Sequence, residues 1–99
     1  MRPWLRGTVA GRRVTVYRRV GPGMDEHDRG ICAKVAGRYV ISVHPDLEGE
    51  RLAEVLLHEL LHAADWDKGE EWIAETGADL ARMLVQAGLI TPRPSGPGC

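Results

Sequence analysis

The sequence predicts an α+β fold in which a small, mostly antiparallel sheet of three to four strands is followed by two helices packed on it. Apolar residues alternate with polar ones through the first half, as in half-buried strands, and recur at helical spacing in the second half. The chain has 99 residues, which suits one domain. We expect residues 1–90 to form this domain and residues 91–99, rich in Pro and Gly, to be a disordered tail.

The first half predicts two pairs of strands. Val14 and Val16 alternate with polar neighbours, and glycine-containing turns separate the strands of each pair. The loop over residues 21–30 combines Gly, Pro and Asp, so it separates the two pairs. The predicted strands cover residues 8–10, 13–17, 30–36 and 39–44, with turns at Gly11-Arg12 and Gly37-Arg38.

The second half predicts two helices. The first runs from about Leu47 to Asp65, after Pro45 ends the last strand, and the second from about Glu70 to Gly88. Gly88 is suited to a helix C-terminus because glycine readily adopts the left-handed conformation found there. Trp66 and Trp72 flank the short turn between the helices and are expected to pack against it.

Composition narrows the class of protein. Two cysteines make no disulfide framework, and the N-terminus lacks the apolar segment of a secretory signal. No apolar run is long enough to span a membrane, so we expect a cytoplasmic protein without a membrane partner. A chain this short often needs an additional source of stability, and a bound metal is the remaining candidate within one chain.

Charge is divided unevenly along the chain. Residues 1–44 carry a net charge of +6 and residues 45–99 a net charge of −7. Such a division can indicate a nucleic-acid surface or two layers with opposite, mutually attracting faces. The basic residues are spread over strands and few aromatics lie among them, so we favour the second interpretation and expect no nucleic-acid partner.

The first predicted helix contains an H-E-x-x-H motif, formed by His58, Glu59 and His62. Residues four apart lie on one face of a helix, so both imidazoles can bind one metal ion. Glu59 lies about 100° round the helix from His58, beside the metal, where a general base belongs. Two imidazoles plus a carboxylate with one open position suit Zn²⁺.

A zinc site needs a third protein ligand, and the second helix supplies acids. They are Glu70, Glu71, Glu75 and Asp79. The apolar arc of this helix contains Ile73 and Gly77, with Glu70 on the arc and Glu71 at its border. If this arc packs on the sheet, the opposite face, which carries Glu75, turns to the first helix.

At these residues the chain resembles the gluzincins, zinc peptidases whose third ligand is a Glu on a later helix. The closest likeness is to minimal gluzincins and to phage-type and ImmA/IrrE-like metallopeptidases. Glu75 and Asp79 match the family's E-x-x-x-D spacing, so the resemblance implies Glu75 as third ligand and Asp79 as the partner that orients a metal-bound His. Glu71 is the reserve ligand.

The sequence therefore predicts a zinc metallopeptidase acting on a peptide or protein, with Glu59 as general base. The alternative is a non-catalytic, zinc-stabilised regulatory module, such as a phage or host accessory protein that recognises a partner. The group that stabilises the oxyanion stays open, with four candidates: His27, Tyr39, His44 and Arg82.

Overall fold

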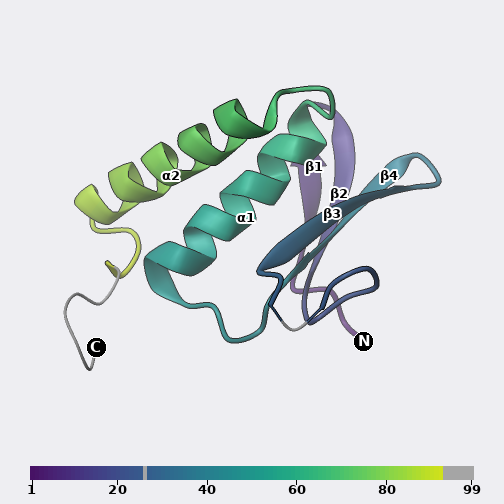
Figure 1. Cartoon of the computed structure of the whole chain (residues 1–99), viewed down its shortest axis with the longest axis horizontal. Helices are drawn as coiled ribbons and strands as arrows, with labels where there is room; N and C mark the ends of the chain where they lie inside the picture. The colour runs from purple at the N-terminus through teal and green to yellow at the C-terminus, as the bar shows by residue number, and fades with distance from the viewer. Residues whose placement is uncertain (26, 93–99) are drawn as a thin grey trace.

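A computed structural model describes residues 1–25 and 27–92 and confirms the α+β fold: four strands are followed by two helices (Figure 1). Most of the predicted tail, including Cys99, lies outside the described residues. The elements are β1 (Leu5–Val9), β2 (Arg12–Arg18), β3 (Gly30–Val35), β4 (Arg38–Val43), α1 (Gly49–Ala64) and α2 (Glu70–Gln86).

The four strands form one mixed, mostly antiparallel sheet in the order β1-β2-β4-β3. Both hairpins, β1–β2 and β3–β4, are antiparallel, and the central pair β2–β4 is parallel. The hairpin turns fall at Ala10-Gly11 and Ala36-Gly37, one residue before the predicted positions. All four turn residues have positive φ, between 49° and 78°. Two consecutive positive φ values characterise the tight turn that matches the twist of a hairpin.

The core lies between one face of the sheet and α1. Its buried residues alternate along β2 and β4, as period-two spacing predicts, and Ala63 contributes from α1. The core cluster contains Val14, Val16, Tyr39, Ile41, Val43 and Ala63. Arg12 donates to the carbonyl of Ala64, which places a positive charge at the C-terminal end of α1, where the helix dipole favours it.

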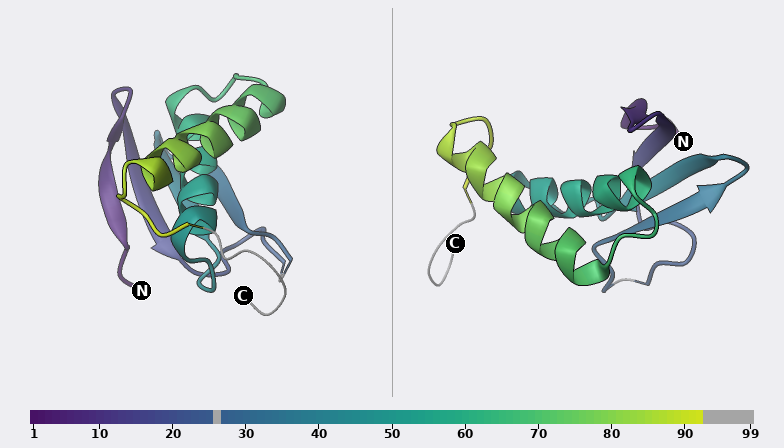
Figure 2. Two further views of the ribbon diagram at one scale, coloured as in Figure 1. Left: turned by 90° about the vertical axis from the view of Figure 1, so that its left-hand side faces the viewer. Right: turned by 90° about the horizontal axis from the view of Figure 1, so that it is seen from above.

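Both helices lie on the same side of the sheet, and α1 makes the direct contact with the strands (Figure 2). Among the described residues, α2 packs against α1 alone. The buried residues of α2 are Ile73, Gly77 and Ala81. A Cβ at Gly77 would lie 3.3 Å from the His58 backbone nitrogen, so glycine permits the close approach of the helices. Neither described helix is long and apolar enough to cross a membrane.

Candidate metal centre

Helix α1 places the three motif residues at the boundary between the sheet and α2. The His58 and His62 rings lie side by side, with centroids 4.9 Å apart. Their side chains are about three-quarters buried, and Glu59 is buried at 8% exposure. Because its imidazoles share a face, α1 presents two nitrogen ligands in one direction.

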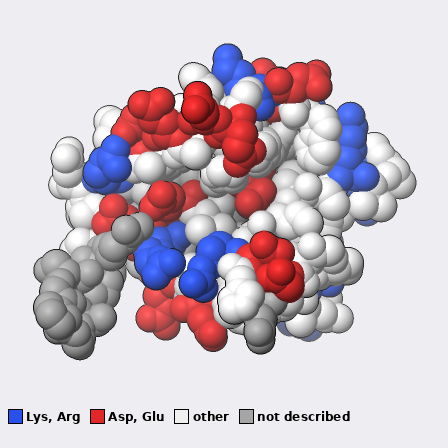
Figure 3. Space-filling model, in the orientation of Figure 1, with Lys and Arg blue, Asp and Glu red and all other residues white. Residues whose placement is uncertain are grey.

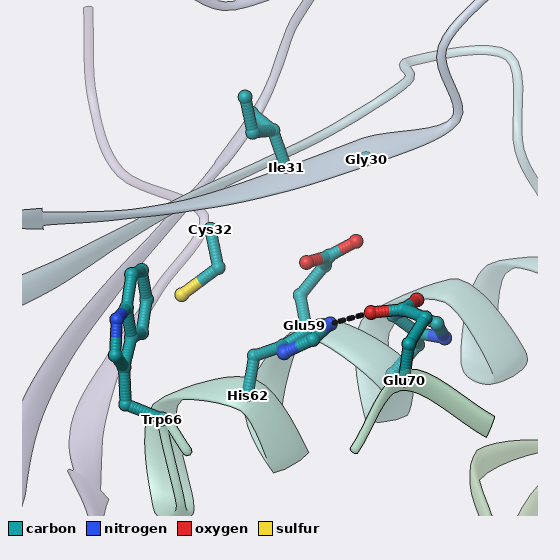
Figure 4. Close-up of a pocket in the computed structure, with 8 residues that line it drawn as sticks. Gly30, Ile31, Cys32, Glu59, His62, Trp66 and Glu70 are labelled. Carbon is teal, nitrogen blue, oxygen red and sulfur yellow. Dashed lines mark ion pairs between the residues drawn. The ribbon is translucent and has the colours of Figure 1, made fainter. Parts of the chain in front are cut away.

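Glu70, the first residue of α2, joins the two histidines. Its carboxylate oxygens lie 2.8 Å from His58 Nε2 and 3.0 Å from His62 Nε2, and Figure 4 shows the carboxylate directed at the His62 imidazole. One ligand atom from each of the three residues lies within 4.8 Å of the other two. The structure therefore gathers two imidazoles and one carboxylate from two helices.

Glu75 is not brought to this group; it is exposed on α2, as is Glu71. Asp79 is also exposed and pairs with Arg82 on the same helix. The physical reason is the orientation of α2. Its apolar arc packs on α1 and not on the sheet, so Glu70, on that arc, faces the histidines.

Two signals in the sequence point to Glu70. It lies three residues before Ile73 and seven before Gly77, which places it on the same helical face as these two residues. It also follows His62 by only eight residues, so a short turn returns it to the end of α1. Both signals require knowing that α2 packs on α1.

Glu59 points from α1 towards β3, on the sheet side of the histidines (Figure 4). A Cβ atom added at Gly30 would lie 3.3 Å from Glu59 Oε2 and 2.8 Å from Val55 Cγ1. A side chain at Gly30 would therefore press on the carboxylate. Burial raises the pKa of Glu59 to about 7; the charge of His58 acts to lower it and that of Glu70 to raise it further.

A cavity of about 510 Å³ opens in front of this group. It is lined by Gly30, Ile31, Cys32, His58, Glu59, His62, Trp66 and Glu70. A second hollow of about 210 Å³ shares Gly30, His58 and Glu59 and extends past Arg29. The two hollows lie along β3, so Glu59 and His58 stand within a cleft bounded by a strand and a helix.

Trp66 closes one side of the cavity, where we expected only packing. Its ring packs at a tilt against Tyr39, with 5.5 Å between centroids, yet the residue stays 40% exposed and lines the cavity. Cys32 lines the same side, and burial, followed by the charge of Glu59, raises the pKa of its thiol to about 12. Its thiol is therefore protonated at neutral pH and adds no charge to the cavity.

The four candidates for oxyanion stabilisation do not line this cavity. Tyr39 is buried at 5% exposure beneath Trp66, and Arg82 is engaged with Asp79. His44 Nδ1 accepts a hydrogen bond from the Asp46 backbone N–H at 3.1 Å. The ionisable side chains that line the cavity are thus those of His58, Glu59, His62, Glu70 and Cys32.

No family model, curated protein or solved structure matches the chain.

Proposed function

We propose that this protein is a zinc-dependent metallopeptidase of minimal gluzincin type, acting in the cytoplasm on a peptide or protein. The observation that carries the proposal is the convergence of His58, His62 and Glu70 beside a buried Glu59 in one cavity. The likeness to gluzincins rests on the H-E-x-x-H motif and a Glu from the next helix, with Glu70 in the role that the resemblance implied for Glu75.

The donor set fits zinc. Two imidazole nitrogens and one carboxylate oxygen are the ligands of many catalytic zinc sites, which keep a further position open. His58, His62 and Glu70 would hold the ion, and their ligand atoms already lie within 4.8 Å of one another. Bound there, zinc would supply Lewis-acid chemistry, polarising a peptide carbonyl and lowering the pKa of a water to about 7.

Glu59 supplies the proton transfers. Its carboxylate lies beside the histidines without pairing with them and faces the cavity in which a scissile peptide would lie. In this role it accepts a proton from the attacking water and donates it to the departing amine. Gly30 supports this role because its missing side chain leaves room for the carboxylate.

Strand β3 supplies a surface for the substrate backbone. Among the described strands it pairs with β4 alone, which leaves its other edge without a strand partner for an extended peptide to occupy, and Gly30 to Cys32 line the cavity. An added strand gains main-chain hydrogen bonds with little dependence on sequence. Gly30 would bring such a peptide past Glu59 and the histidines.

The test compares wild type with Glu59→Gln in hydrolysis of a casein digest, followed by mass spectrometry. The variant should bind as much zinc as wild type and lose at least about a hundredfold in rate, because it lacks the general base. Glu75→Gln, a change of the same kind at an exposed position of α2 that lines neither hollow, should retain activity. Equal cleavage by wild type and Glu59→Gln would contradict the proposal.

One observation favours the non-catalytic alternative. Since α1 is the one described element that α2 contacts, an ion shared by His58, His62 and Glu70 would fasten α2 to the rest of the protein. A zinc-stabilised regulatory module needs that bond and has no use for Glu59. Zinc-bound wild type without hydrolytic activity, and with unchanged properties in Glu59→Gln, would identify this function.

A further inference from the structure

The face of the sheet opposite the helices carries an arrangement of arginines that the metal centre does not use. Val14 and Val16 point into the core, so alternation directs Arg13, Thr15 and Tyr17 to the open face. Arg6 pairs in register with Thr15 and shares this face. Val14 lies beside Tyr39 in the parallel pair, so the preceding residues, Arg13 and Arg38, are neighbours as well.

The arginines of the strands divide into two groups. Arg12 donates to the Ala64 carbonyl, and Arg18 donates to the carbonyls of Pro45 and Leu47 at 2.9 and 2.6 Å. These two serve the contact between sheet and helices. By contrast, the guanidinium groups of Arg6, Arg13 and Arg38 have no hydrogen-bond or ion-pair partner within the described part of the chain.

The local charge is uncompensated. None of the four strands contains Asp or Glu, while acidic side chains gather over α2 on the helix side (Figure 3). Like charges on neighbouring strands destabilise a sheet. An anion on the open face would relieve the repulsion that Arg13 and Arg38 create.

The three arginines surround a hollow. It has a volume of about 330 Å³ and is lined by Arg6, Gly7, Arg13, Val14, Thr15, Tyr17 and Arg38. Guanidinium groups donate in a fixed fork that matches the oxygens of phosphate and carboxylate. The hollow also presents the Thr15 and Tyr17 side chains, which can donate further hydrogen bonds.

We propose that this hollow binds a compact phosphate-bearing ligand with two or more negative charges, held by Arg6, Arg13 and Arg38. A carboxylate carries one charge, so an acidic peptide would need several residues to neutralise three arginines. A diphosphate places its charges in one small group, which suits a hollow of about 330 Å³. The charges come either from a free ligand, such as a nucleoside diphosphate, or from neighbouring phosphodiesters of a nucleic-acid strand, each of which carries one charge.

The experiment titrates inorganic pyrophosphate into ¹⁵N-labelled protein at low salt and follows backbone amide shifts. Shifts should concentrate in residues 6–8, 13–17 and 38–40. Arg13→Gln should weaken pyrophosphate binding at least about tenfold, as expected for the loss of a charge-assisted contact. Arg51→Gln removes the same charge from an exposed position on α1 and should change affinity less than about twofold.

A second arm uses a short oligothymidylate under the same conditions. Tighter binding than pyrophosphate, with the same loss in Arg13→Gln, would support the site and assign its phosphate to a nucleic-acid backbone; weaker binding would assign it to a free ligand. The proposal is overturned if pyrophosphate shifts only residues near His58 and His62, or if the two variants weaken binding equally. Tighter binding of a poly-glutamate peptide than of pyrophosphate at the hollow would also overturn the proposal. So would an Arg13→Gln variant that loses a salt-sensitive self-association but still binds pyrophosphate like wild type.

Discussion

The two helices differ in how they are attached to the rest of the protein. Helix α1 contacts all four strands and α2, whereas α2 packs on α1 alone among the described elements. The candidate metal centre spans this boundary, with His58 and His62 on α1 and Glu70 on α2. Glu70 therefore lies on the helix with fewer contacts to the rest of the protein, so its position beside the histidines depends on the packing of α2 on α1.

Substitutions at two buried isoleucines should have the largest effects and should show whether α2 unfolds separately from the sheet. Ile41 and Ile73 are both fully buried, the first beneath α1 in β4 and the second in α2. Changing either to Ala should cost about 2–5 kcal/mol of local packing. Ile41→Ala should lower the global unfolding free energy measured in urea by that amount. Ile73→Ala should mainly speed amide exchange in α2, with β4 still protected; equal loss of protection in β4 would break the comparison.

Zinc binding should stabilise α2 more than α1. At a hundred times its dissociation constant, zinc should raise the free energy of unfolding by about 2.7 kcal/mol, because it binds the folded state. The gain in amide protection should be greater in α2 than in α1. A chelator that leaves both the melting temperature and α2 exchange unchanged would exclude a bond between the helices.

Alanine substitutions at Gly30 and Gly7 measure how tightly the cleft is packed relative to an open strand. A Cβ at Gly30 would meet Val55 Cγ1 at 2.8 Å and Glu59 Oε2 at 3.3 Å, while one at Gly7 would meet nothing within 4 Å. Gly30→Ala should therefore cost about 1–3 kcal/mol in urea unfolding through overpacking and reduce any peptidase activity. Gly7→Ala should stay within about 1 kcal/mol of wild type. Equal effects would show that the cleft is not tightly packed at Glu59.

The smallest expected effect concerns Cys32. Burial raises its pKa to about 12, so the folded protein retains the thiol proton, whereas the unfolded chain loses it near pH 9. Its contribution to stability is thus fully present below pH 9 and declines as pH rises towards 12. Iodoacetamide labelling at pH 8, mapped to the Cys32 peptide, should be far slower in native than in unfolded protein. Similar rates would show an accessible thiolate.

Most of the fold could be predicted because its signals are local. Val14 and Val16 alternate with polar residues, and glycines mark both hairpins, so each strand pair is encoded within about fifteen residues. The parallel contact between β2 and β4 joins segments more than twenty residues apart. Nothing in either hairpin specifies which of its edges meets the other.

The candidate site likewise combines residues placed by local spacing with one placed by a contact between two helices. His58, Glu59 and His62 lie within five residues of one helix, so their geometry follows from helical spacing. The third ligand depends on which face of α2 meets α1. Apolar residues at Ile73 and Gly77 mark a buried face without specifying whether a sheet or a helix covers it. With the sheet assumed to cover it, the helical phase agreed with Glu75, which the resemblance to gluzincins had implied.

The central claim is that His58, His62 and Glu70 form a zinc site, and zinc content tests it most directly. Wild type, Glu70→Gln and Glu75→Gln would be purified with zinc, dialysed, and measured by elemental mass spectrometry. One zinc per chain in wild type and in Glu75→Gln, with its loss in Glu70→Gln, is the predicted result. A wild type without zinc, or loss in Glu75→Gln with retention in Glu70→Gln, would contradict the claim.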